Sequence, residues 1–207
     1  MELSYFGANC LRFTTKKAQI IVDDNLSKLG LKAVTKPTDI ALHSFAGVPE
    51  ASAHFTANMP GEYEIADVAI HGVAARAHMD EEGKTSATIF TIESGDLRVA
   101  VLGHIYPELS EDQLEQIGLV DILVVPVGNS GYTLDGIGAL KLIKAIEPKV
   151  VIPTHYADKA VKYEVPQAEL AEALKNLGME MSEAIDKYKP KPTELGETTT
   201  LIVLERQ

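Results

Sequence analysis

Histidines are the residues of this chain whose type and position most clearly suggest chemistry. Three of the six follow segments with strand character: His78 comes shortly after VAIHGVAARA, His104 directly after LRVAVLG, and His155 after KVVIPT. Ligands collect at the carboxyl ends of strands in open α/β sheets, so these imidazoles are expected to meet. Three neutral imidazoles suit zinc and leave a fourth position for water. The pattern predicts one zinc ion, or one manganese or iron ion, at His78, His104 and His155, although a histidine at a strand end can also simply bind nearby backbone.

The other histidines and the nearby acidic residues give weaker signals. His71 falls inside a strand pattern and is interpreted as structural, whereas His43 and His54 flank a polar loop and fit either role. Asp23 and Asp24 follow the strand QIIV and could offer carboxylates to a metal. Solvated turn residues are the more ordinary interpretation of such an acidic pair.

Several common catalytic signatures are absent from the sequence. It contains no Gly-x-Ser-x-Gly elbow, no Walker loop and no Gly-x-Gly-x-x-Gly dinucleotide turn. The glycine-rich piece from Gly128 to Gly131 could present backbone N–H groups to an anion, or form a plain strand-to-helix turn. The one cysteine, Cys10, excludes an internal disulfide and a multi-thiol zinc site. Its position in a strand pattern favours a small buried hydrophobe.

Composition limits the class of protein and its partners. The 207 residues, 45% of them hydrophobic, fit a single domain over residues 1–207. With 19 basic against 30 acidic residues, the formal charge of −11 disfavours nucleic acid and anionic membranes as partners. A small molecule is the expected ligand, and the oligomeric state is left open. Because no leader-like segment or bilayer-length apolar run occurs, a cytoplasmic location is expected.

The elements that must position these residues are short strands in the first half of the chain. Apolar and β-branched runs bounded by turn signals predict strands, and Ser94 to Asp96 is a hairpin turn. The predicted strands are 3–6, 11–14, 18–22, 39–42, 63–73, 87–92 and 97–102.

The second half alternates buried strands with helices. Ser110 and Gln113 form a capping-box pattern that opens a short helix ending near Gly118. Apolar runs predict strands at 121–126, 149–153 and 198–204, and helical spacing predicts helices at 135–146 and from Pro166 to Gly178. Hairpins followed by strand–helix units indicate a mixed sheet, or two packed sheets with helices outside.

Six segments, taken in order, resemble the metallo-β-lactamase superfamily, in the branch of small metal-dependent hydrolases that includes ascorbate-phosphate lactonases. They are SYFGANCLRF, IVDDNLSKLGLK, PGEYEIADVAIHGVAARAH, LRVAVLGH, DILVVPVGNSGYTLD and EPKVVIPTHY, and they span most of the chain. The resemblance implies an α/β (α+β) domain, a four-layer αββα sandwich of two mixed β-sheets with a metal site at one rim.

The resemblance also has gaps at the metal site. The family carries a His-x-His-x-Asp-His motif soon after the strand that reads DIAL here, and this chain has HSFAGVPE, in which only His43 and Glu50 could bind a metal. His78 and His155 match the family's later metal histidines, whereas His104 stands in place of its bridging aspartate. One imidazole lone pair binds one metal, so a normal binuclear centre is not expected.

Two kinds of function are consistent with these residues. The first is a hydrolase in which a metal-activated water attacks an ester, lactone or phosphoester, with Asp80 or Glu50 as the assisting carboxylate. The second is a non-catalytic descendant of the fold that binds a small molecule or a partner protein through the cleft where the family holds its metal. The missing motif favours the second function, and the three histidines favour the first.

Overall fold

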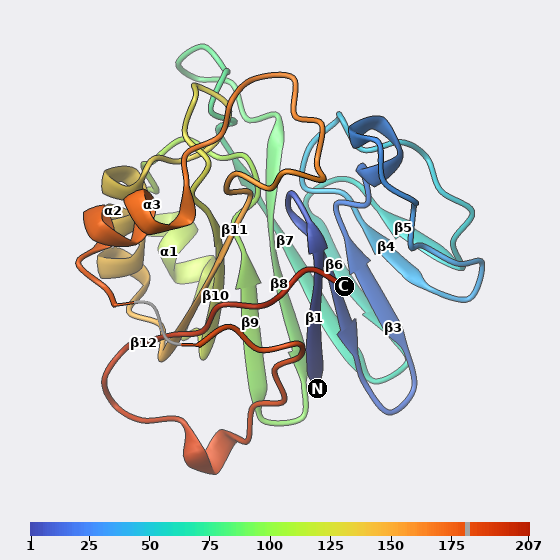
Figure 1. Ribbon diagram of the computed structural model, residues 1–207. Helices are drawn as coiled ribbons and strands as arrows, with labels where there is room; N and C mark the ends of the chain where they lie inside the picture. The colour runs from blue at the N-terminus through green and yellow to red at the C-terminus, as the bar shows by residue number, and fades with distance from the viewer. Residues whose placement is uncertain (181–182) are drawn as a thin grey trace.

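Two β-sheets pack against each other in the computed structural model, which describes residues 1–180 and 183–207 (Figure 1). The first sheet has five strands in the order β1-β2-β3-β4-β5, and the second has seven in the order β12-β11-β10-β9-β8-β7-β6. Both sheets mix parallel and antiparallel pairs, so the predicted α+β architecture with two mixed sheets is confirmed.

The first sheet holds the amino-terminal strands. Strands β1, β2 and β3 pair antiparallel, and β3, β4 and β5 pair parallel. Their bounds are β1 Glu2–Gly7, β2 Cys10–Thr14, β3 Gln19–Val22, β4 Ile40–Leu42 and β5 Phe55–Ala57.

The second sheet is antiparallel from β6 to β9 and parallel from β9 to β12. Its bounds are β6 Gly61–Ile65, β7 Val68–Ala75, β8 Ala87–Ser94, β9 Leu97–Val101, β10 Ile122–Pro126, β11 Val150–Thr154 and β12 Thr200–Leu201. β10 and β11 are buried along their whole length, as strands covered on both faces must be.

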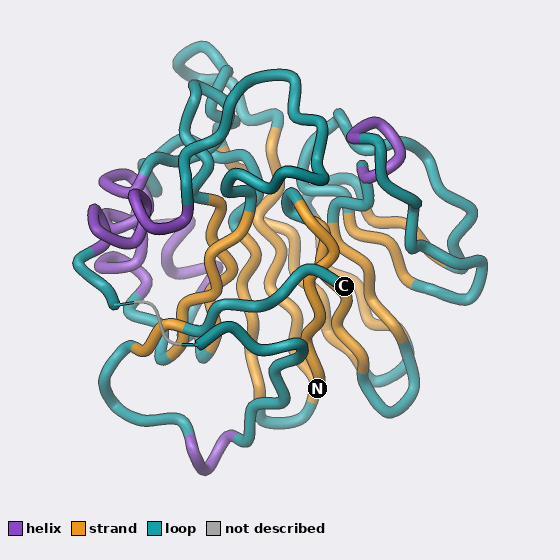
Figure 2. Tube along the Cα trace, in the orientation of Figure 1, coloured by secondary structure: helices purple, strands orange, loops and turns teal. Residues whose placement is uncertain are grey.

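Three α-helices cover the outer face of the second sheet (Figures 1 and 2). They are α1 Glu111–Ile117, α2 Gly136–Ile146 and α3 Leu170–Leu177. The predicted capping box is present, since the Ser110 hydroxyl accepts from the Gln113 N–H and the Gln113 side chain accepts from the Ser110 N–H. No helix in the described part of the chain is long and apolar enough to cross a membrane.

The layer outside the first sheet is thinner than the resemblance implies. It is made by the 3₁₀ helix η1, Leu26–Leu29, and the loop after it, where Leu26 packs with Cys10 and Ile21. Within the described residues no α-helix covers this face. Cys10 is fully buried there, which confirms it as a small core residue.

Two apolar cores hold the layers together. Phe13 and Leu11 from the first sheet pack with Phe90 and Val124 from the second, and all four side chains have no exposed surface. A second core joins the other face of the second sheet to the helices, with Leu142 of α2 among its members. Each such large side chain contributes about 1.5–3 kcal/mol when removed from water. The rim that carries the site is therefore anchored on rigid strands.

Several sequence expectations need correction. The expected strand 63–73 is two strands, because Ala66 and Asp67 both adopt positive φ and close a hairpin between β6 and β7. Strand β5 carries only three residues and was not predicted. Helix α3 begins at Leu170 rather than at Pro166. Helical spacing predicts that Ile137 shares the apolar face of α2 with Ile143 and Ile146. In the structure Ile137 is 68% exposed, and the helix buries Ala139, Leu142 and Ile143.

Candidate functional site

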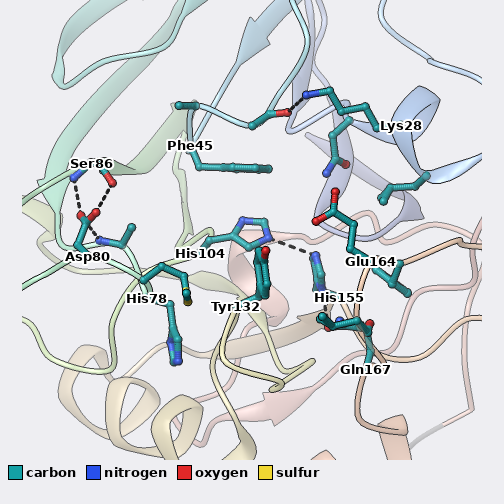
Figure 3. A pocket seen from close by; sticks show the side chains of 18 residues that line it. Lys28, Phe45, His78, Asp80, Ser86, His104, Tyr132, His155, Glu164 and Gln167 are labelled. Atoms are coloured by element: carbon teal, nitrogen blue, oxygen red, sulfur yellow. Dashed lines mark hydrogen bonds between the residues drawn. The ribbon is translucent and has the colours of Figure 1, made fainter.

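A pocket of about 400 Å³ opens at one rim, where loops that follow the carboxyl ends of β3, β4, β7, β9, β10 and β11 converge (Figure 3). This is the place where the topology brings strand ends together, as expected for ligand sites on such sheets. Both His104 and His155 line it, from the loops after β9 and β11. His78 lines it from the loop after β7.

His104 and His155 form a close, buried pair. Their Nε2 atoms lie 3.2 Å apart, and the residues are 9% and 6% exposed. The Gln167 amide donates to the Val165 carbonyl, so its oxygen faces His155 Nδ1 at 3.1 Å and accepts from it. The proton on Nδ1 leaves a lone pair on His155 Nε2, which is directed at His104. This is the orientation that an outer hydrogen bond gives to a ligating histidine.

Burial keeps both imidazoles neutral. It lowers the pKa of His155 to about 4, and it lowers the pKa of His104 well below its usual range, with help from the positive charges that His155 and His78 would carry. A neutral imidazole is the form that binds a metal. His104 Nδ1 and His78 Nδ1 are buried and find no hydrogen-bond partner among the described residues.

The backbone at His155 is held in an uncommon conformation. Its φ of 58° lies in the left-handed region, which a non-glycine residue adopts at a cost of about 1–3 kcal/mol and which clusters at functional sites. Its N–H donates to the Ala8 carbonyl at 2.7 Å, which secures the turn against the loop between β1 and β2.

The third predicted histidine does not join the pair. The His78 N–H donates to the His104 carbonyl at 2.8 Å, but its ring lies apart from the other two and packs 6.1 Å from the Tyr106 ring (Figure 3). Among the described residues, no three His, Cys, Asp or Glu side chains are arranged to hold one ion. The expected meeting of three imidazoles is therefore reduced to two in this arrangement.

Phe45 packs against His104, which also contacts His155. Its ring centroid lies 4.2 Å from that of His104, and Phe45 follows His43 at the spacing of the second histidine in a His-x-His pair. A phenyl ring offers no lone pair to a metal. The described residues therefore offer two imidazoles, His104 and His155, to one ion, and the donor set does not fit two ions.

The carboxylates predicted to assist are engaged or distant. Asp80 accepts from the Ala77 and Ser86 N–H groups and from the Ser86 hydroxyl, and the Ser86 donors hold the pKa of Asp80 below its usual value. Asp80 therefore orders its own loop. Glu50 and His54 are exposed and do not line the pocket. His43 is buried outside the pocket lining, with burial lowering its pKa.

Asp23 is a buried anchor below the rim, which corrects the interpretation of Asp23 and Asp24 as solvated turn residues. Its carboxylate accepts from the Ser44 N–H at 2.7 Å, the Ser44 hydroxyl at 2.6 Å and the Asn9 amide at 2.7 Å. Asn9 in turn accepts from the Thr154 hydroxyl at 2.7 Å. These bonds join the residue before Phe45 to the residue before His155.

Glycine at position 103 makes this arrangement possible. A Cβ on Gly103 would collide with the Ser44 hydroxyl, and its φ of 63° is costly for other residues. The bond network and the loop that carries His104 therefore pack directly against each other.

The Asp23 network predicts a pH dependence of stability. Burial raises the pKa of Asp23 to about 6, while Ser44 and Asn9 oppose the shift. A raised folded-state pKa means that the stabilisation is full below the unfolded pKa near 4 and is lost as pH rises through about 6. Between pH 7 and pH 5, the free energy of unfolding of the wild type should rise by about 1 kcal/mol relative to that of Asp23→Asn. Denaturant unfolding of both proteins at each pH measures this difference, and parallel pH profiles would refute it.

Sequence reasoning missed several residues that shape the pocket. Glu164 points its carboxylate into the pocket (Figure 3), and Tyr163 packs 5.0 Å from the His155 ring. Gln167 orients His155 from twelve residues farther along the chain. These residues lie in a loop without a periodic pattern, and no spacing rule selects them from the sequence.

Comparison with known proteins is consistent with the fold. A family model described as Beta-lactamase superfamily domain matches residues 2–155. A search of curated proteins finds no match. The matched segment includes all three strand-end histidines.

Three solved structures illustrate the similarity. A candidate Zn-dependent hydrolase of the metallo-β-lactamase superfamily from Thermotoga maritima is 23% identical, with a TM-score of 0.75 over 99% of this chain and 98% of its own. Igni18, a metallo hydrolase from Ignicoccus hospitalis, is 17% identical, with a TM-score of 0.65 over 99% and 95%. A candidate metal-dependent hydrolase from Parabacteroides distasonis is 16% identical, with a TM-score of 0.65 over 98% and 93%. At these identities the likeness concerns the fold.

Proposed function

Because this chain belongs to the β-lactamase superfamily, we propose that it is a metal-dependent hydrolase whose site is the rim pocket, with one ion at His104 and His155. The observation that carries this proposal is the 3.2 Å separation of the two Nε2 atoms. Two nitrogens bound to one tetrahedral zinc at 2.0–2.1 Å lie about 3.3 Å apart. When bound, such an ion supplies a water that loses its proton near neutral pH.

The remaining parts of the proposed site come from the chain itself. Gln167 holds the His155 ring, while Phe45 packs against His104 and Tyr163 packs against His155. Since Asp80 is engaged by its own loop, Glu164 is the pocket carboxylate placed to take a proton from an attacking water. The bond cleaved is an ester, lactone or phosphoester. The resemblance of the sequence motifs to the branch of small hydrolases that includes ascorbate-phosphate lactonases supports this proposal, and zinc is the first metal to test.

Metal binding tests this function directly. Protein purified without chelator or added metal should hold about one equivalent of zinc, manganese or iron, and its melting temperature should fall in chelator. His104→Ala and His155→Ala should lose the ion, and His71→Ala, a histidine on β7 outside the rim pocket, is the matched control. A wild type with neither bound metal nor a response to chelator would contradict the proposal.

One observation favours a second function, that of a non-catalytic binding protein. With Phe45 over His104 and no third donor in the described residues, the pair is equally explained as a hydrogen bond from one imidazole to the other. In that case the pocket binds a small molecule without cleaving it. The two functions separate in the same experiment, because only the hydrolase requires the ion.

A further inference from the structure

The walls of the rim pocket are mostly apolar and aromatic. Phe45 and Tyr163 flank the histidine pair, and the Tyr163 hydroxyl donates to the Tyr156 carbonyl at 3.1 Å, so this residue offers the pocket its ring. Met79 and Tyr132 also line the pocket and are 70% and 42% exposed. Such surfaces favour an apolar ring or chain over a charged group.

The charges of the pocket disfavour an anion. Lys28 is the one cation among the described lining residues, and its ammonium donates to the Gly47 carbonyl at 2.8 Å. The lining includes two carboxylates, of which Glu164 points into the pocket (Figure 3) and Asp80 is bound by Ser86. The described lining contains no arginine, the residue that usually pairs with phosphate or carboxylate. An anion here would meet one exposed ammonium against two carboxylates, so the charge of the lining disfavours it.

We propose that the metal-free pocket takes a neutral molecule with an apolar ring or chain, and that it rejects phosphorylated and carboxylated ligands. The inference rests on the proposed function, because it assumes that the rim pocket is the substrate site. A volume of about 400 Å³ is within the range of small-ligand sites and accommodates a single substituted ring.

Binding of stable, matched probes tests the selectivity without any turnover. Benzamide, benzoate and phenylphosphonate share one ring and differ in charge, and their affinities can be measured by ligand-observed NMR. The first measurement uses chelator-treated protein, because a bound divalent ion adds positive charge of its own. Benzamide should bind at least about tenfold more tightly than either anion. Benzoate or phenylphosphonate binding as tightly as benzamide in metal-free protein would overturn the inference.

Variants assign the selectivity to named groups. Glu164→Gln should reduce the ratio of benzamide affinity to benzoate affinity by about threefold, since it removes a negative charge that repels benzoate from the pocket. Tyr132→Ser should weaken benzamide several-fold by removing ring contact. Glu172→Gln, an acidic residue of α3 outside the pocket lining, is the charge-matched control and should change neither affinity.

The outcomes separate the two proposals. If the purified protein holds no metal but prefers benzamide to the two anions, the proposed hydrolase is contradicted and this inference is supported. If the protein binds one ion at His104 and His155 but prefers the anionic probes in its metal-free form, the hydrolase is supported and this inference is contradicted.

Discussion

Asp23→Ala should lower the free energy of unfolding by about 3–5 kcal/mol, because it leaves several buried donors without an acceptor. The lost bonds are those from the Ser44 N–H, the Ser44 hydroxyl and the Asn9 amide, all within 2.7 Å of a carboxylate with no exposed surface. Each orphaned buried donor costs about 1–3 kcal/mol, and the hydroxyl can recover part by rotating. Denaturant unfolding measures the change.

The substitution should also loosen the pocket, since Ser44 precedes Phe45 and Asn9 holds Thr154 next to His155. Affinity of the pocket for benzamide should therefore fall in Asp23→Ala under conditions where the protein is still folded.

Asp67→Ala is the matched control for the backbone. Asp67 also has a positive φ, 59° against 50° for Asp23, so alanine meets similar strain at both positions. Asp67 is exposed and pairs with Lys17 at the surface, where an ion pair contributes about 0–1 kcal/mol. Asp23→Asn should fall between the two, because its amide keeps one acceptor. Equal losses in Asp23→Ala and Asp67→Ala would show that the network contributes nothing beyond backbone strain.

The architecture was accessible from the sequence because it depends on periodic burial. The apolar runs around Val124 and Ile152 predicted the central strands, and Ser110 with Gln113 predicted the start of α1. The hairpin at Ala66 and Asp67 was missed because the dipeptide Ala-Asp does not resemble the Asn-Gly or Asp-Gly turns that usually mark positive φ. The short strand β5 was missed because three residues carry too little alternation to detect.

The site was predictable only in part. The positions of His104 and His155 after parallel strands predicted that they would meet, since such strand ends lie on one rim. His78 follows β7, which also ends at this rim, but its side-chain direction depends on the loop and no spacing fixes it. The role of Asp80 as a loop anchor likewise depends on Ser86, six residues away in a segment without pattern. Topology predicts which strand ends meet, and loop detail decides which side chains do.

Phe45→His should raise the affinity for zinc or cobalt by about 100-fold or more, because it adds a third imidazole beside the pair. The Phe45 ring centroid already lies 4.2 Å from that of His104 on the pocket side, and the smaller imidazole fits the space of the phenyl ring. Cobalt absorption reports a tetrahedral site, and competition with a chelating dye gives the affinity.

Two controls separate the added nitrogen from the removed ring. Phe45→Leu opens the space without a donor, and Phe55→His makes the same substitution at a phenylalanine outside the pocket lining, packed against Tyr63. Neither should gain more than a few-fold in affinity. If Phe45→Leu binds cobalt as well as Phe45→His does, the phenyl ring limits access of the metal to the pair, and the added imidazole contributes nothing. If only Phe45→His binds, the phenyl ring at position 45 is what separates this chain from a three-histidine metal site, and the physical reason is one missing lone pair.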